Sequence, residues 1–304
     1  MKDRDAELLE KIAVLKKKRN AVILTHNYQL GEVQDIADFV GDSLELSQRA
    51  AETNADVIVF CGVQFMAETA SILCPDKVVL LPDVNSGCLM ADMITAEGLR
   101  AKKKEHPQAV VVCYVNSPAE VKAESDVCCT SANAIRVVES LDAQEILFIP
   151  DQYLGRYVSA KTGKEMILWP GFCPTHVRIK PERIKELRQE YPQAQVVVHP
   201  ECTPEVIALA DEVLSTGGMC RYARRGEVGE MVVGTEIGII HRLKKENPGK
   251  RFIPVSEQAI CPDMKLITLE KVLWSLKEMS PEVKVTEVIR LRAKAAVDRM
   301  LKIG

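Results

Sequence analysis

Short apolar segments alternate along this chain with segments in which apolar residues recur every three or four positions. The first pattern is typical of buried strands and is clearest at residues 21–25 and 56–60, while the second predicts an amphipathic helix at residues 5–19. The same patterns predict further strands at residues 78–81, 109–113, 145–149, 166–169, 195–198, 231–234 and 251–255. They predict further helices at residues 33–39, 44–53, 65–72, 95–105, 132–141, 181–190, 219–225, 237–246, 269–279 and 286–300.

The order of these elements repeats three times. Each repeat ends in an apolar strand that is followed by a cysteine, and Cys88, Cys173 and Cys261 are 85 and 88 residues apart. Short apolar strands separated by helices form parallel sheets that are covered on both faces. The sequence therefore predicts an α/β fold of three pseudo-threefold-related α/β/α domains, each with a small parallel sheet, around a central active-site cavity.

The repeat also predicts the domain boundaries. We expect repeats at residues 1–88, 89–173 and 174–261, with the C-terminal helices of residues 262–304 packing back on the first repeat.

Composition and charge restrict the class of protein. Of the 304 residues, 47% are hydrophobic and 27% are charged, which is ordinary for a globular chain, and the net charge of −3 gives no indication of a nucleic-acid partner. The N-terminal segment has no apolar signal core, and no apolar run is long enough to cross a bilayer. We therefore expect a cytoplasmic protein with no membrane partner. In that compartment its ten cysteines, which include no CxxC pair, are expected to be core residues or metal ligands.

The three periodic cysteines form the strongest candidate site. A single cysteine after a strand is usually a core residue, but three at equivalent strand ends are expected to meet at one point. Three thiolates leave one position open on a tetrahedral zinc ion, or one iron open on a four-iron cluster. All-thiolate ligation favours the iron–sulfur cluster, although the spacing alone does not exclude zinc.

Polar residues follow the first strand of each repeat. His26, Tyr114 and His199 occupy equivalent positions, and Tyr28, Asn116 and Glu201 lie two residues further on. Since ligands of parallel sheets bind beyond the carboxyl ends of the strands, we expect these six side chains to converge with the three cysteines.

Hydroxyl side chains occur just before a predicted helix in each repeat, at Ser43, Ser131 and Ser215–Thr216. Such residues commonly act as helix N-caps. Three helix N-termini facing one cavity would also attract an anionic substrate.

Several short motifs together resemble one known family. The motifs are His26-Asn27-Tyr28, Gly41-Asp42-Ser43, Ser86-Gly87-Cys88, Tyr114-Val115-Asn116, Gly171-Phe172-Cys173, His199-Pro200-Glu201, Ser215-Thr216-Gly217-Gly218 and Cys261-Pro262. They closely resemble quinolinate synthases, in the order that this family has them and over the whole chain. The resemblance implies the threefold α/β/α fold and a [4Fe–4S] cluster on Cys88, Cys173 and Cys261.

The resemblance also implies a reaction. Family enzymes condense iminosuccinate (iminoaspartate) with dihydroxyacetone phosphate to give quinolinate, phosphate and two waters in NAD biosynthesis, and L-aspartate oxidase supplies the imine. The implied substrate-binding residues are His26, Ser43, Tyr114, Val115, Asn116, Ser131, His199, Pro200, Glu201 and Thr216. The implied catalytic residues are Tyr28, Glu201 and His199, as groups that move protons.

One departure from the pattern concerns the last cysteine. Some family members carry a CxxC sequence there, but Cys261 is followed by Pro262, Asp263 and Met264. A thiol–disulfide switch at this point is therefore not expected.

The residues leave three other functions open. An aconitase-type hydro-lyase would share the open iron but would release no phosphate. A non-catalytic iron–sulfur sensor or carrier would not need six convergent polar side chains. A zinc protein using the same thiols would be colourless.

Overall fold

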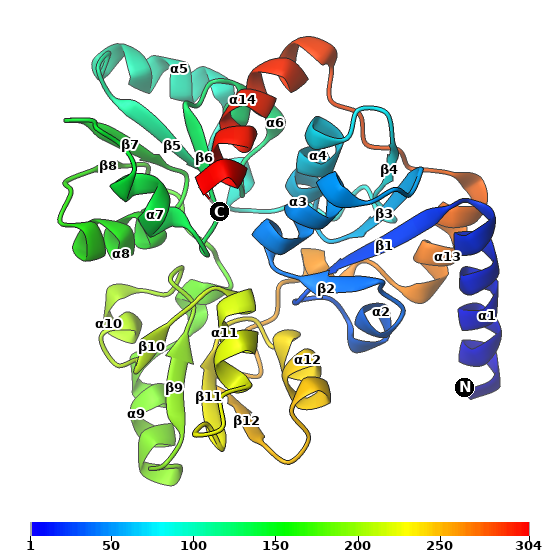
Figure 1. Cartoon of the computed structure of the whole chain (residues 1–304). Coiled ribbons are helices and arrows are strands. Elements are labelled where there is room, and N and C mark those ends of the chain that lie inside the picture. The colour runs from blue at the N-terminus through cyan, green and yellow to red at the C-terminus, as the bar shows by residue number, and fades with distance from the viewer. Residues whose placement is uncertain (1, 304) are drawn as a thin grey trace.

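The computed structural model describes residues 2–303 and has three lobes, each built around a four-stranded sheet (Figure 1). The strand orders are β2-β1-β3-β4, β6-β5-β7-β8 and β10-β9-β11-β12, and neighbouring strands pair in parallel. The same order in all three sheets confirms the predicted threefold α/β architecture. Among the described residues, no helix combines the length and the apolar character needed to cross a membrane.

The first sheet lies at the N-terminal end of the chain. Its strands are β1 (Ala21–His26), β2 (Phe39–Gly41), β3 (Val57–Cys61) and β4 (Val78–Leu80). The helices of this part of the chain are α1 (Lys2–Lys18), α2 (Gly31–Asp35), α3 (Ser43–Glu52) and α4 (Gln64–Leu73), and the 3₁₀ turn η1 (Ala91–Met93) follows Cys88. β3 is buried throughout, as expected for a central parallel strand covered on both faces.

The other two sheets repeat this arrangement. The second has β5 (Val110–Tyr114), β6 (Val127–Cys129), β7 (Ile146–Ile149) and β8 (Ile167–Leu168), with α5 (Ala96–Glu105), α6 (Ala119–Ala123), α7 (Ala134–Glu139), α8 (Gln152–Thr162) and η2 (His176–Arg178). The third has β9 (Gln195–Val198), β10 (Glu212–Val213), β11 (Glu230–Gly234) and β12 (Arg251–Pro254), with α9 (Pro181–Glu190), α10 (Pro204–Ile207), α11 (Thr216–Ala223), α12 (Ile239–Glu246) and η3 (Asp263–Lys265).

Each sheet has a short edge strand that the apolar pattern did not predict, namely β2, β6 and β10. An aspartate just before each of these strands accepts a hydrogen bond from a backbone amide of the neighbouring strand. The bonds are Ile23 N to Asp38 Oδ2 at 2.8 Å, Val111 N to Asp126 Oδ2 at 2.7 Å and Val196 N to Asp211 Oδ2 at 2.7 Å. The equally short β4 and β8 were predicted because they lie in runs of four apolar residues, at 78–81 and 166–169. β2, β6 and β10 have at most three consecutive apolar residues, so only their pairing identifies them as strands. The helix predicted at residues 33–39 was wrong at its C-terminal end, where β2 begins at Phe39, and the helices α6, α8 and α10 were not predicted.

The C-terminal helices pack on two different parts of the molecule. We expected both on the first repeat, and α13 (Leu269–Glu278) does pack against α1 and β3. In contrast, α14 (Glu287–Ile303) lies mainly along α6 and β6 of the second sheet, and it also contacts α4 (Figure 1). Small residues explain this contact, because Ala293 of α14 is buried with Ala119 and Ala123 of α6. α14 therefore bridges the first and second lobes.

Candidate active site

One pocket collects side chains from all three lobes. It is lined by most of the residues that the sequence singled out: His26, Tyr28, Ser43, Cys88, Tyr114, Asn116, Ser131, Cys173, His199, Glu201, Thr216 and Cys261. Val115 and Pro200, also expected to contact substrate, are buried but are not among its lining residues. The convergence arises because each sheet places its first strand between its second and third, and the crevice at such a switch point opens beyond the carboxyl ends.

The turns after β1 and β9 have the same local geometry. The amide of Tyr28 donates to His26 Nδ1 at 3.2 Å, and the amide of Glu201 donates to His199 Nδ1 at 3.3 Å. The backbone amide two positions later therefore holds the imidazole ring of each histidine in place. The second lobe differs, because Tyr114 takes the place of the histidine at the end of β5.

Glu201 joins the second and third lobes. Its Oε1 accepts a hydrogen bond from the Tyr114 hydroxyl at 2.6 Å, and its Oε2 lies 2.7 Å from His176 Nδ1. Burial alone raises the pKa of this carboxyl, but the charge of the neighbouring His176 and the hydrogen bonds from His176 and Tyr114 hold the pKa well below its usual range. A carboxylate that is buried yet ionised can accept a proton from a bound molecule.

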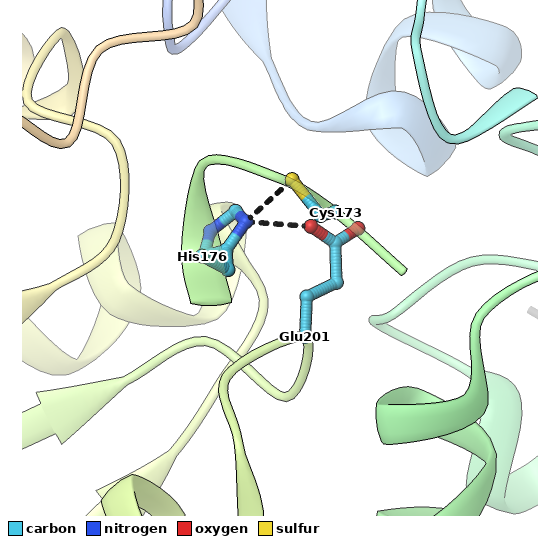
Figure 2. A group of neighbouring side chains, drawn as sticks. All are labelled: Cys173, His176 and Glu201. Atoms are coloured by element: carbon cyan, nitrogen blue, oxygen red, sulfur yellow. Dashed lines mark hydrogen bonds and ion pairs between the residues drawn. The ribbon is translucent and has the colours of Figure 1, made fainter. Parts of the chain in front are cut away.

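His176 connects Glu201 to Cys173, the second of the three periodic cysteines. Its Nδ1 lies 3.1 Å from Cys173 Sγ and faces Glu201, as Figure 2 shows. Its Nε2 lies 2.8 Å from Thr235 Oγ1 and 3.4 Å from the Tyr28 hydroxyl. The ring also stacks on His199 with centroids 4.8 Å apart. His176 thus contacts Tyr28 of the first lobe as well as Glu201 and His199 of the third lobe.

The tyrosines and the remaining histidines are shifted by burial. Burial raises the pKa values of Tyr28 and Tyr114 well above that of free tyrosine, and the nearby Glu201 carboxylate adds to the effect. Burial also lowers the pKa values of His26 and His199 to about 3. At neutral pH the site therefore holds protonated phenols that can donate and neutral imidazoles that can accept.

The three periodic cysteines have equivalent surroundings. Each is a free thiol that is partly exposed, and each is followed by a 3₁₀ turn. Backbone amides of these turns donate to the sulfurs: Met90 and Ala91 to Cys88, His176 to Cys173, and Asp263 and Met264 to Cys261. Burial raises the pKa of Cys88 to about 12 and that of Cys261 to about 11. Such thiols lose their protons when they bind a metal, and the amide donors stabilise the resulting thiolates.

A second set of ligand atoms lies close together in the same pocket. Atoms of Cys173, His176 and Glu201 all lie within 4.8 Å of one another, so they could hold a single metal ion. Mixed sulfur, nitrogen and oxygen ligands would suit zinc. The residues thus fit either a group shared by the three cysteines or one ion at this corner.

The predicted helix N-termini do face the pocket, but they are partly occupied. The side chain of Asp42 caps α3 and accepts from the amides of Leu44 and Glu45. Ser215 caps α11 and accepts from Gly218 N. Ser131 lies three residues before α7, a helix of only six residues. Ser43, Ser131 and Thr216 nevertheless line the pocket with their hydroxyl-bearing side chains, and Asn116 Oδ1 is buried there without a hydrogen-bond partner. An unpaired buried amide oxygen indicates a place for a ligand donor.

Several lining residues were missed from the sequence, among them His176, Arg178 and Glu236. His176 had a usable signal, since it follows Cys173 by three positions in Cys-Pro-Thr-His. Glu236 follows β11 at a strand end that has the same place in its sheet as β3 and β7. The sequence signal was the polar residue after the first strand of each repeat, whereas Glu236 follows the third strand of its repeat.

Comparison with known proteins agrees with the geometry of the site. The family model of quinolinate synthetase A protein matches residues 10–302. A quinolinate synthase of Dehalococcoides mccartyi (strain CBDB1) is 64% identical, covering 96% of this chain and 97% of that protein. Quinolinate synthases of Geobacter sp. (strain M21) and Methanosarcina barkeri (strain Fusaro) are 57% and 55% identical, over 96% and 98% of this chain and 96% and 98% of those proteins. This chain therefore belongs to the quinolinate synthase family.

Proposed function

We propose that this protein is a quinolinate synthase that condenses iminosuccinate with dihydroxyacetone phosphate and releases phosphate and two waters. The observation that carries the proposal is one pocket lined by three cysteines from three lobes together with Tyr28 and Glu201, in a chain of this family. The product feeds NAD biosynthesis. The unstable imine would come from an oxidase that acts on L-aspartate, which makes L-aspartate oxidase the expected functional partner.

The resident cofactor of this proposal is a [4Fe–4S] cluster on Cys88, Cys173 and Cys261. The three free thiols with backbone amide donors fit such a group, since three protein ligands leave one iron open. When bound, the cluster supplies a Lewis-acidic iron that polarises a substrate oxygen.

The side chains of the pocket would perform the binding and the proton transfers. We assign Glu201, an ionised carboxylate that accepts hydrogen bonds from Tyr114 and His176, as the base. Tyr28 is assigned as an acid, since its hydroxyl is protonated at neutral pH and hydrogen-bonds to Thr235. His199, a neutral imidazole, would accept a proton or orient Glu201.

The remaining polar side chains are assigned to substrate binding. His26, Ser43, Asn116, Ser131 and Thr216 offer hydrogen bonds to carboxylate, hydroxyl and phosphate oxygens. Tyr114 would bind substrate while it holds Glu201 in place. Val115 and Pro200 would contribute through their backbones, as neither side chain lines the pocket.

The deciding experiment is a condensation assay on protein purified without oxygen, with iminosuccinate generated in situ and both quinolinate and phosphate measured. Equal amounts of quinolinate and phosphate would support the proposal. Dehydration without phosphate release would identify a hydro-lyase instead. Iron and zinc contents measured on the same sample distinguish the two candidate metal sites. About four iron atoms per chain would support the cluster, whereas about one zinc ion per chain would support the site at Cys173, His176 and Glu201.

A further inference from the structure

The central pocket is poor in positive charge for a site that would take two anionic substrates. Four carboxylates line it, those of Asp42, Glu201, Glu236 and Asp263. Among the described lining residues, Arg178 is the only lysine or arginine. His26 and His199 add no charge at neutral pH, because burial lowers their pKa values to about 3. The remaining lining histidine, His176, is already paired with the Glu201 carboxylate at 2.7 Å.

Other sources of positive potential near the pocket are already engaged. The side chains of Asp42 and Ser215 accept hydrogen bonds from backbone amides at the N-termini of α3 and α11. Lys265 pairs with Glu236 at 2.8 Å and donates to the Tyr28 carbonyl. Arg242 pairs with Glu246 at 2.6 Å and donates to Asn27 Oδ1 at 2.7 Å. A substrate anion therefore needs a cation that is not used in this way.

Arg178 meets this requirement. It is exposed, and its guanidinium has no hydrogen bond or ion pair among the described residues. It is the last residue of the 3₁₀ turn that follows Cys173, and two backbone bonds hold this turn, Val177 N to Cys173 O at 3.2 Å and Ile179 N to His176 O at 3.1 Å. The fixed turn presents a free guanidinium at the edge of the pocket, beside a candidate cluster ligand.

A second, outer pocket shares Arg178 with the central pocket. This outer pocket, next to β12, also includes Lys180, Arg183 and the carboxylate of Glu257. Arg183 is already paired with Glu186 at 2.8 Å, which leaves Arg178 and Lys180 as the cations of this pocket without an ion pair among the described residues. Such an arrangement attracts anions toward the site and raises their local concentration.

We propose that Arg178 binds the anionic group of an incoming substrate, a phosphate monoester or a carboxylate, at the mouth of the central pocket and so determines substrate affinity. This inference rests on the proposed function. A guanidinium can bind either group through two parallel hydrogen bonds from two nitrogens, whereas the ammonium group of lysine has a single nitrogen. Arg178 is in this sense a specificity residue and moves no proton.

The test compares Arg178→Gln and Arg178→Lys with the control Arg183→Gln, which alters a cation that lines only the outer pocket. KM and kcat are measured separately for dihydroxyacetone phosphate and for iminosuccinate, with iron content checked in every sample. Arg178→Gln should raise one KM about tenfold, leave kcat within about twofold and keep the iron, because a charge-assisted bidentate contact is lost while the chemistry is untouched. Arg178→Lys should recover part of the affinity, and Arg183→Gln should change KM by less than about twofold.

The affected substrate identifies the bound group. A higher KM for dihydroxyacetone phosphate assigns Arg178 to the phosphate, and a higher KM for iminosuccinate assigns it to a carboxylate. Unchanged KM values would overturn the inference, and so would a loss of kcat that follows a loss of iron. If wild-type protein makes no quinolinate, the proposed function fails, and calorimetric binding of inorganic phosphate and of succinate decides the inference separately. Weaker binding of either probe to Arg178→Gln than to Arg183→Gln would support it, and equal binding would refute it.

Discussion

Glu201 shows how single residues acquire their chemistry in this site. It is almost completely buried, and yet it is held as a carboxylate by the Tyr114 hydroxyl of the second lobe and by His176 in the loop between the lobes. A buried carboxylate without such partners would take up a proton. The base of the proposed reaction thus depends on hydrogen bonds from residues 87 and 25 positions away in sequence.

The first prediction concerns the proton-transfer residues. Glu201→Gln removes the carboxylate that we propose as the base, and Tyr28→Phe removes the hydroxyl that we propose as the acid, while both keep the size of the side chain. Each should lower kcat by about 10²–10⁴-fold, the usual contribution of a positioned acid or base, with iron content unchanged. Steady-state kinetics and iron analysis measure this, and near-normal turnover of both variants would remove these residues from the mechanism.

The second prediction concerns His26 and pH. Burial lowers its pKa to about 3, and the neighbouring His199, Lys265 and Arg242 lower it further against the opposite effect of Glu201. Histidine in the unfolded chain titrates near pH 6.5, so between about pH 6.5 and 3 the unfolded state binds a proton that the folded state does not. Native stability is therefore independent of this group above about pH 6.5 and is lost as the pH falls below it, by about 2 kcal/mol at pH 5.

His26→Asn should remove this dependence. Urea unfolding of wild type and variant at pH 7 and at pH 5 should show a smaller loss of unfolding free energy for the variant. His241→Asn is the control, because His241 lies at the surface beside Asp35. An equal loss in all three proteins would mean that His26 is protonated in the folded state.

At the scale of elements, the repeated aspartates explain how very short strands stay in register. Asp38, Asp126 and Asp211 each accept a hydrogen bond from a backbone amide of the neighbouring strand. In all three repeats the donor lies 15 residues before the aspartate. The residues that follow these edge strands include Ser43, Ser131 and Thr216 of the pocket. Edge-strand pairing thus positions hydroxyl side chains of the site.

The third prediction tests this element. Asp126→Ala leaves the Val111 amide without its 2.7 Å acceptor and should lower the unfolding free energy by about 1–2 kcal/mol. Asp126→Asn, which keeps an acceptor oxygen, should cost less. The control Asp142→Ala changes an exposed aspartate in the loop before β7 and should have little effect. Urea midpoints measure the difference, and equal midpoints for Asp126→Ala and Asp142→Ala would show that the bond contributes nothing.

At the scale of the whole molecule, the site exists only where the three lobes meet. Direct contacts join the lobes around it: Asn27 donates to Thr216 Oγ1 at 2.8 Å, and Ser215 donates to Asp42 Oδ2 at 3.0 Å. Both bonds connect the first lobe to the third, while α14 connects the first to the second. The three candidate ligands therefore depend on one another through the packing of the entire chain.

The fourth prediction follows from this sharing of ligands. Each of Cys88→Ser, Cys173→Ser and Cys261→Ser should lose most of the iron and sulfide, because two remaining thiolates hold a four-iron cluster poorly. Cys128→Ser, at a fully buried cysteine of β6, should retain them. Iron, sulfide and visible absorption of oxygen-free samples measure the outcome. Retention of the cluster in any of the first three variants would exclude that cysteine as a ligand.

The fifth prediction concerns air. An iron that is open to substrate is also open to oxygen, so exposure of the purified protein to air should abolish activity together with the visible absorption. Undiminished activity after prolonged aerobic handling would contradict the proposed cluster.

Local sequence patterns were enough to predict the architecture and most of the lining of the pocket. Strands such as β3 and helices such as α9 are visible in it because apolar periodicity is a local property, and the threefold repeat then implies that Cys88, Cys173 and Cys261 occupy equivalent strand ends. Parallel strands bring their carboxyl ends to one edge, which is why residues as distant as His26 and His199 could be assigned to one cavity.

The other features depend on contacts between segments far apart in the chain. β2, β6 and β10 have at most three consecutive apolar residues and are identified only by their pairing partners. α14 packs mainly on the second lobe, where its Ala293 is buried with Ala119 and Ala123 of α6. His176 and Arg178 line the pocket because η2, which contains both, lies beside it. Glu201 is held ionised by its hydrogen bonds from His176 and Tyr114. Contacts between segments far apart in sequence leave no periodic signal, so packing alone determines which charge is paired and which is free.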